Sequence, residues 1–177
     1  MALTLLQAHT VVADPHGDRA WATDMFVPRV GDVVSKARTV DKPADEPRTS
    51  TVLADDTSLT IPVAANARYA MDAFLIVDGD EAAGMSLTFT APSGSSGSWA
   101  PMAPQTAGGT DQQLRPTAYG QAANVGVTAD GVIIPPRGAL VTSNTAGDFT
   151  LQWAQTVTSQ SPLTLRAGSW LLLTRTA

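Results

Sequence analysis

The chain has 177 residues, enough for one ordinary domain and an additional segment but marginal for two domains. Only 15% of the residues are charged, 44% are hydrophobic, and the formal net charge is -5. This acidic balance argues against binding to nucleic-acid phosphates or anionic lipid, because such binding needs clustered Lys and Arg. The sequence also contains no run of about 18 apolar residues, the length that a membrane-spanning helix needs.

The N-terminus, MALTLLQAHTVV, is briefly apolar but has no basic region before it and no long apolar core. We therefore predict no signal peptide and expect the chain to fold in a cytoplasm, even if it works elsewhere. The sequence contains no cysteine, which excludes disulfides, thiolate zinc sites and cysteine nucleophiles. Stability must come from the core and from assembly.

The first 48 residues differ in composition from the rest. They hold 13 charged side chains, whereas the whole of 49–177 holds only 14. Prolines at 15, 28, 43 and 47 leave no room for a long helix between them. The sequence therefore predicts an extended N-terminal arm or linker with little regular structure over 1–48 and a folded domain over 49–177. An ordinary N-terminal subdomain is the alternative.

From residue 49 the pattern is that of short β-strands separated by turn residues. Asp55 and Asp56 form a predicted turn, and the strand predicted at 68–77 is apolar on both faces towards its end. Without helical periodicity, this pattern predicts an all-β sandwich, jelly roll or barrel. Further strands are predicted at 85–90, 121–128, 131–134, 139–143, 149–156, 163–165 and 169–174.

The last predicted strand, 169–174, is apolar on both faces. Alternation places Trp170 and Leu172 opposite Leu171 and Leu173. One face can pack on the domain core, and the other needs a second cover. We therefore predict these four residues as a candidate subunit interface, where burying Trp170 or Leu172 would contribute about 1.5–3 kcal/mol each. The alternative is a central strand of a monomeric sandwich.

Residues 91–112 are rich in Pro, Gly, Ser and Thr and are predicted as a long loop, a kind of segment that often forms contact surfaces. Trp99 lies in this segment and Tyr119 follows it. Because aromatic rings pack against the apolar faces of sugars, both are candidate exposed contact residues. Core or interface packing is the alternative for both.

Patterns for catalysis and metal binding are weak. The two histidines, His9 and His16, both lie in the predicted arm, and no G-x-S-x-G nucleophile motif occurs. Asp78, Asp80 and Glu81 are clustered without the spacing of a calcium loop, which favours a turn. We therefore predict no enzyme, no metal and no cofactor, while a pair of catalytic carboxylates stays open because aspartates are common.

Several separated segments resemble one protein family. AGDFTLQWAQ (146–155), a Thr- and Ser-rich turn and AGSWLLLTR (167–175) are similar to the end of small structural proteins from tailed bacteriophages of actinobacteria. STVLADDTSLTIPVAANARYAMDAFLIVDG (50–79) and LTFTAPSGSSGSW (87–99) resemble that family's opening strands and the loop that follows them. The resemblance covers 50–177 and leaves the arm unplaced.

The resemblance implies a virion structural protein with a jelly-roll-like β-sandwich and no catalytic residues. We expect a homotrimer that decorates the capsid by binding the major capsid protein, because the chain has no coiled-coil or collagen-like stalk to extend a fibre. One alternative is a minor tail or receptor-binding protein of the same fold, which would contact tail proteins or host surface glycan. A carbohydrate-binding module is the other.

Overall fold

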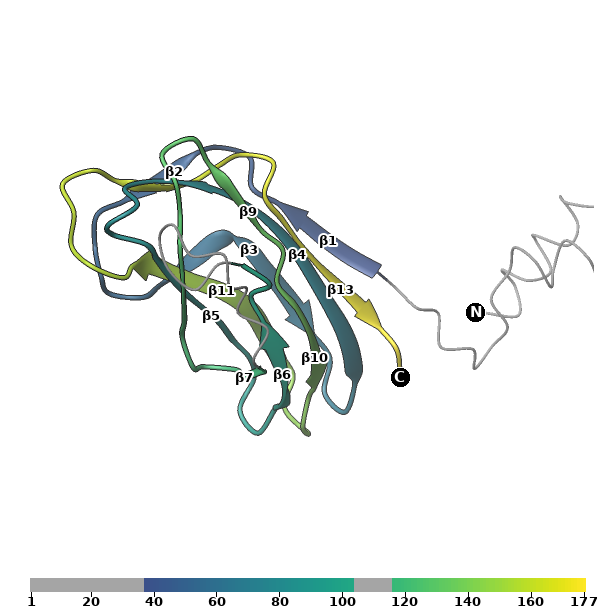
Figure 1. Cartoon of the computed structure of the whole chain (residues 1–177). Coiled ribbons are helices and arrows are strands. Elements are labelled where there is room, and N and C mark those ends of the chain that lie inside the picture. The colour runs from purple at the N-terminus through teal and green to yellow at the C-terminus, as the bar shows by residue number, and fades with distance from the viewer. Residues whose placement is uncertain (1–36, 104–115) are drawn as a thin grey trace, which may run out of the picture. The chain divides into compact units, whose positions relative to one another are not determined.

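The computed structural model describes residues 37–103 and 116–177, and every regular element in these two ranges is a β-strand. No helix in this part of the chain is long and apolar enough to cross a membrane. The strands form two antiparallel sheets that pack face to face (Figure 1). Their bounds are β1 (Ala37–Asp41), β2 (Glu46–Arg48), β3 (Ala54–Val63), β4 (Arg68–Asp78), β5 (Met85–Thr90), β6 (Ser96–Ala100), β7 (Thr117–Ala118), β8 (Ala123–Val125), β9 (Val132–Ile134), β10 (Arg137–Val141), β11 (Gly147–Gln155), β12 (Leu163–Leu165) and β13 (Trp170–Arg175).

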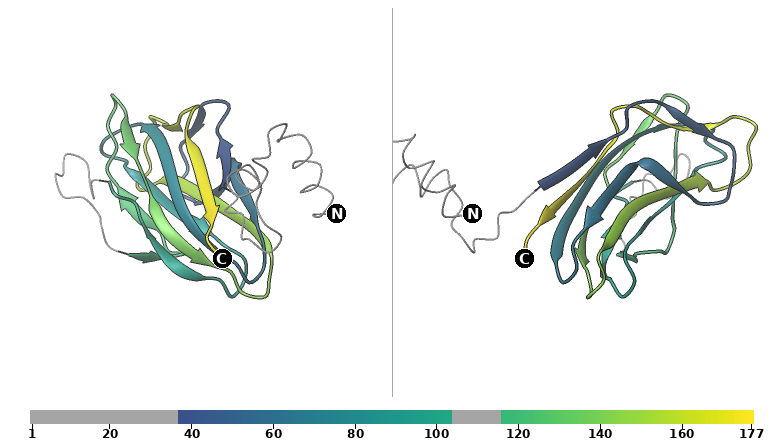
Figure 2. Two further views of the ribbon diagram at one scale, coloured as in Figure 1. Left: turned by 90° about the vertical axis from the view of Figure 1, so that its right-hand side faces the viewer. Right: turned by 180° about the vertical axis from the view of Figure 1, so that it is seen from behind.

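Eight of these strands have the pairing order of a jelly roll. The β4 sheet contains β1, β13, β4 and β10 side by side, and the β11 sheet contains β3, β11, β5 and β8 (Figures 1 and 2). Ranked along the chain, the eight strands are ordered 1-8-3-6 in one sheet and 2-7-4-5 in the other, which is the double Greek key of a jelly roll. The remaining strands extend the β4 sheet. The predicted all-β, jelly-roll-like sandwich is confirmed.

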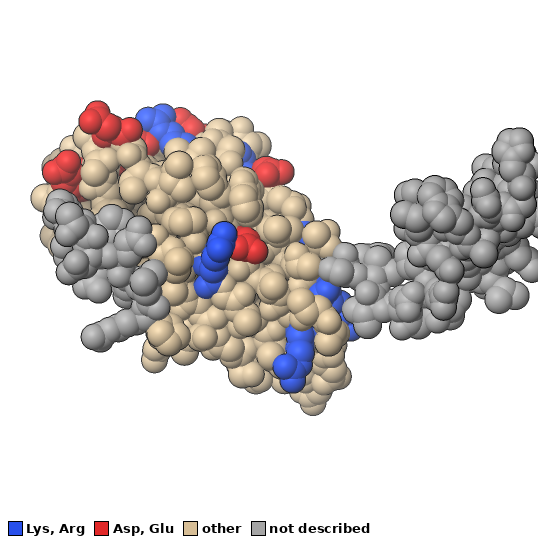
Figure 3. All heavy atoms as spheres, turned by 45° about the vertical axis from the view of Figure 1, so that its right-hand side comes forward, with Lys and Arg blue, Asp and Glu red and all other residues tan. Residues whose placement is uncertain are grey.

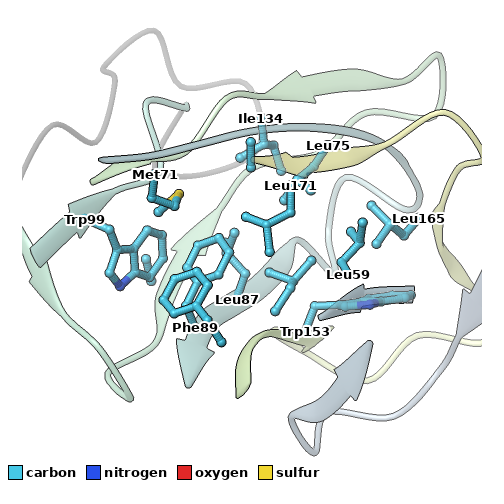
Figure 4. Close-up of a cluster of buried hydrophobic side chains, with 14 of the residues drawn as sticks. Leu59, Met71, Leu75, Leu87, Phe89, Trp99, Ile134, Trp153, Leu165 and Leu171 are labelled. Atoms are coloured by element: carbon cyan, nitrogen blue, oxygen red, sulfur yellow. The ribbon is translucent and has the colours of Figure 1, made fainter. Parts of the chain in front are cut away.

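The core lies between the two sheets because alternation turns one face of each long strand inward. In β4, the odd-numbered residues from Tyr69 to Val77 are buried and the even-numbered residues are half-buried. Figure 4 shows side chains from both sheets pointing into the space between them. The residues labelled there are Leu59, Met71, Leu75, Leu87, Phe89, Trp99, Ile134, Trp153, Leu165 and Leu171.

The N-terminal boundary predicted at residue 48 is wrong. Strand β1 pairs with β13 and β2 pairs with β12, so 37–48 belongs to the sandwich. Four of the charged side chains that made this segment resemble an arm, Lys42, Asp45, Glu46 and Arg48, form ion pairs within the fold. Residues 1–36 of the predicted arm, with His9 and His16, lie outside the described residues.

Lys42 anchors this segment through a buried ion pair. Its side chain is only 2% exposed, and Nζ lies 2.7 Å from Asp56 Oδ2 and 2.5 Å from Glu46 Oε2. The Trp153 indole Nε1 donates to the same Asp56 oxygen at 3.0 Å. A buried carboxylate is costly unless its lone pairs are occupied, and these donors offset that cost.

Asp56 reaches the interior because β3 bulges at this point. Asp55 lies opposite Gln152 and Thr60 lies opposite Thr150, so β3 advances five residues where β11 advances two. Within the bulge, Asp56 Oδ1 accepts hydrogen bonds from the backbone N–H groups of Ser58 and Leu59, each at 3.0 Å. The pair predicted as a turn is therefore a bulge inside one strand.

Arg48 extends the network to β2. Its guanidinium carbon lies 4.0 Å from the centroid of the Trp153 ring, a cation–π contact. Arg48 Nε and Nη2 donate to Glu46 Oε1 at 2.8 and 2.6 Å, and Nη1 donates to the carbonyls of Ala54 and Trp153. One cluster thus joins β2, β3 and β11 to the chain that follows β1.

Replacing Lys42 with methionine is expected to lower the free energy of unfolding by about 3–5 kcal/mol, because the Asp56 carboxylate stays buried without its cation. Arg137→Met is the control, since the Arg137–Asp72 pair, 3.2 Å long, is 73% and 42% exposed. Its loss should cost less than about 1 kcal/mol. Urea unfolding at pH 7 measures both variants, and equal losses would contradict a structural role for the buried pair.

Asp56 should also make stability sensitive to acid. Burial alone would raise the pKa of Asp56, but hydrogen bonds from Lys42, Trp153 and Leu59 outweigh burial and hold it below its ordinary value of 3.8. A lowered folded-state pKa stabilises the fold fully above the unfolded pKa, and this stabilisation is lost as pH falls through the folded value. Below about pH 4, unfolding free energy should therefore fall more steeply with acidification in wild type than in K42M/D56N. Equal slopes would contradict the assignment.

Candidate interaction surface

The outer face of the β4 sheet carries an apolar patch. Alternation along β4, β9 and β13 turns Phe74, Ile76, Ile133, Trp170 and Leu172 outward, and we call these five residues the outer patch. Trp170 lies opposite Phe74 in the pairing of β13 with β4, and Ile133 lies opposite Ile76 in the pairing of β9 with β4. The left view of Figure 2 shows β13 and β4 adjacent on this side of the domain.

Two rings form the centre of the outer patch. Phe74 and Trp170 stack with their ring centroids 6.0 Å apart and their planes 10° from parallel. Ile133 is 51% exposed, and the other four members are half-buried. A contiguous group of large apolar side chains that keeps contact with water is typical of a surface that binds another protein.

Charged residues border the outer patch, and exposed Asp41 lies opposite Trp170 in the pairing of β1 with β13. The Asp72–Arg137 pair flanks Leu172, and Arg166 forms ion pairs with Asp45 and Asp78 at one end of the sheet. Figure 3, which brings this side forward, shows a mostly uncharged surface with a few separated charges. An apolar centre with a polar rim is the usual anatomy of a protein–protein interface.

The structure divides the four residues that were predicted as a subunit interface. Leu171 and Leu173 are 1% and 0% exposed and pack in the core, so the prediction is wrong for them. Because these two side chains are buried, a partner subunit cannot contact them. Trp170 and Leu172 point to the outer face, and their contact with a partner stays a prediction. The alternation of the strand separates the two pairs.

Trp99 is not an exposed contact residue, and that prediction is wrong. Its side chain is 1% exposed, and its ring lies edge-on to Phe89 with centroids 5.1 Å apart (Figure 4). The predicted loop contains β6, whose backbone approaches β10 closely. A Cβ atom on Gly97 would lie 2.0 Å from the Ala139 carbonyl oxygen, so glycine is required here for strand pairing and does not mark a loop.

Tyr119 is half-buried rather than freely exposed. Its ring lies edge-on to Phe149 with centroids 5.3 Å apart, and its Cε2 would be 3.1 Å from a Cβ on Gly97. The absence of a side chain at Gly97 therefore makes room for this ring. Tyr119 and Trp99 do not form one surface, because the Trp99 side chain is buried.

The acidic cluster after β4 is a turn, as predicted. The Ala83 N–H donates to the Asp80 carbonyl at 3.0 Å, and Asp78 pairs with Arg166. Asp80 Oδ2 accepts a hydrogen bond from Ser159 Oγ at 2.7 Å. This hydrogen bond is the main reason that the pKa of Asp80 is lowered. Over 37–103 and 116–177, no group of three or more His, Cys, Asp or Glu side chains could hold a metal ion.

Part of the outer patch could not be predicted from the sequence. The sequence predicts that the end of the strand at 68–77 and the strand at 169–174 are apolar on both faces, but it does not predict that these two strands pair. Ile133 was missed as well, because three residues of β9 show too little alternation to indicate a face. The signal that was available is the pair of doubly apolar strands, since two such strands are best accommodated side by side.

No family model and no curated protein matches the chain. Among solved structures, it is similar to a chain in the structure of infectious bursal disease virus Gx strain, with 12% identity over 80% of this chain and 36% of that chain and a TM-score of 0.30. For the Gt strain the values are 12%, 81%, 38% and 0.28, and for the VP2 subviral particle of the same virus they are 8%, 81%, 40% and 0.23. The chain thus spans at most 40% of these three virus proteins, and TM-scores this low carry no argument about function. The resemblance to actinobacteriophage proteins stays a prediction.

Proposed function

We propose that this chain is a structural protein of virus particles, and more narrowly a decoration protein that binds the outer surface of a tailed bacteriophage head as a homotrimer. The outer patch is the observation that supports this proposal most. It gives a jelly-roll domain a group of outward-facing apolar side chains that is suited to contact with other proteins. The segments that resemble phage structural proteins supply the narrower assignment.

The outer patch can account for the trimer. Three copies around a threefold axis can turn the same face inward, so that their patches meet near the axis. Trp170 stacked on Phe74 is suited to the centre of this contact, because buried aromatic residues carry much of the binding energy in interfaces. The Asp72–Arg137 pair at the rim would set orientation more than affinity.

The proposed work of the protein is binding, without a catalytic step. A trimer that binds the assembled shell and not its separated subunits stabilises the shell by mass action. The main partner is therefore the major capsid protein. A position on the tail would use the same fold and the same patch, and the particle experiment below separates the two positions.

Cryo-electron microscopy of virions from wild-type phage and from a phage lacking this gene tests the proposal. We expect trimeric density on the outside of wild-type heads and its loss from the deletion particles. The deletion particles should also release their DNA at a lower temperature, because they lack the added contacts.

Two variants supplied to the deletion phage sharpen this experiment. Leu172→Lys places a charge in the outer patch and should remove the density from heads. Asn124→Lys adds the same charge at the exposed position of the edge strand β8 in the other sheet and should leave the density in place. Density on the tail alone would contradict the decoration role, and absence of the protein from purified particles would contradict any virion role.

A further inference from the structure

The buried Lys42 cluster brings an amine into contact with two carboxylates. Lys42 Nζ lies 2.7 Å from Asp56 Oδ2 and 2.5 Å from Glu46 Oε2, so both oxygens contact the same nitrogen. The Lys42 and Asp56 side chains are almost completely buried, whereas the Glu46 side chain keeps a third of its surface exposed. The cluster therefore holds a nucleophile, a carboxyl carbon and a group that can transfer protons, with access to water from the Glu46 side.

The cation of this cluster is a lysine in a chain that otherwise uses arginine. The sequence contains nine arginines and only two lysines, at 36 and 42. Arginine is the usual residue for a buried ion pair, because its planar guanidinium binds a carboxylate through two hydrogen bonds and keeps its charge. A buried lysine can lose a proton and become a nucleophile, which arginine cannot. Lysine at this position is thus suited to a reaction as well as to charge pairing.

The Asp56 carboxyl group is oriented for attack by this nitrogen. Its Oδ1 accepts hydrogen bonds from the backbone N–H groups of Ser58 and Leu59, each at 3.0 Å. Such donors stabilise the negative charge that develops on an oxygen when a nucleophile adds to the carbon. Oδ2 faces Lys42 Nζ and accepts a hydrogen bond from Trp153 Nε1 at 3.0 Å. One oxygen is thus placed to carry charge and the other to leave as water.

We propose that Lys42 and Asp56 join in an isopeptide bond, an amide between the two side chains, with Glu46 as the group that transfers protons. One proton passes from Lys42 Nζ to Asp56 Oδ2, which leaves a neutral amine beside a neutral acid. The nitrogen then forms a bond to Cγ, and an electron pair of the C=O bond moves to Oδ1. Glu46 Oε2 takes a second proton from the nitrogen and gives it to Oδ2. The Cγ–Oδ2 bond breaks, water leaves with both protons, and the carbonyl at Oδ1 is restored.

This reaction balances without an oxidant or any other reactant. The ammonium and the carboxylate are consumed, one amide and one water are formed, and the Glu46 carboxylate is regenerated. The reaction occurs once in each chain and acts on no external substrate. It therefore goes beyond the proposed assembly role and does not depend on it.

Burial favours the amide because the reaction removes two charges from the interior. A buried ion pair carries a desolvation cost that a neutral amide does not. The fold also holds the two groups in contact, and well-oriented groups in one molecule react as if at about 10⁵–10⁸ M. Both effects oppose the excess of water that favours free acid and amine in solution.

The bond is expected to form slowly. The hydrogen bonds that hold the pKa of Asp56 low keep the pair charged, so the reactive neutral pair is scarce. Freshly purified protein therefore contains the ion pair, and the amide accumulates during incubation. Unfolding of wild type for comparison with Lys42→Met is accordingly measured on unreacted chains, which intact mass identifies.

Peptide mass spectrometry of the full chain tests the inference. Wild-type protein is kept at physiological temperature and neutral pH for several weeks, and samples are digested with trypsin. Cleavage after arginine separates peptide 39–48 from peptide 49–68, because Pro43 protects the bond after Lys42. The amide joins these peptides into one species with their summed mass less one water, and its amount should grow with time. Loss of water at a single aspartate would leave the two peptides separate.

Two results with wild type would overturn the inference. One is absence of the joined peptide after the full incubation. The other is its formation at the same rate in protein unfolded by urea, because the reaction depends on the folded arrangement. A trimer without the joined peptide would leave the assembly proposal intact, and a monomer with the joined peptide would leave this inference intact.

Variants test the role of each group. Glu46→Gln keeps the amine and the acid but removes the proton acceptor, so joining should slow by about a hundredfold. Asp45→Asn is the matched control, because the Asp45 carboxylate pairs with Arg166, and it should react as wild type does. Lys42→Arg keeps a cation and should give no joined peptide. Joining of Glu46→Gln at the wild-type rate would contradict proton transfer by Glu46.

Discussion

A β-sheet has two faces, and a sandwich of two sheets covers only the inner face of each. Along β13, and in β4 at Phe74 and Ile76, both faces are apolar, so the inward residues Leu171 and Leu173 build the core while Trp170 and Leu172 remain at the surface. Apolar area left in water forgoes about 25 cal/mol per Å² of stabilisation. That the domain keeps such a face over two paired strands is the constraint from which its proposed role in assembly follows.

The buried Lys42 cluster fixes the position of this face. Lys42 follows β1 directly, and its backbone N–H donates to the Ser169 carbonyl at 2.8 Å, while the Gly168 N–H donates to the Lys42 carbonyl at 2.9 Å. The residue thus binds the strand that carries Trp170 through its backbone and the Asp56 carboxylate through its side chain. Because β1 covers the free edge of β13, the cluster keeps Trp170 and Leu172 inside a paired sheet rather than at its margin.

Much of the fold could be predicted from the sequence, because alternation and turn residues report directly on strands. The strands at 85–90 and 163–165 were predicted to the residue, and those at 68–78, 147–155 and 170–175 to within two residues. The failures have physical causes. The charge density at 37–48 predicts an arm. This prediction fails because the sequence cannot show that Lys42 and Asp56, fourteen residues apart, meet in the interior. Gly97 indicated a loop although it permits close strand pairing, and burial of Trp99 depends on that pairing.

The oligomeric state of the purified protein tests the central claim most directly. Light scattering coupled to size-exclusion chromatography gives the mass of the wild-type protein and of Leu172→Lys and Asn124→Lys across a wide concentration range. We predict three subunits for wild type and Asn124→Lys, and a folded monomer for Leu172→Lys. A wild-type protein that stays monomeric at the highest concentration, or a Leu172→Lys protein that remains a trimer, would contradict assembly through the outer patch.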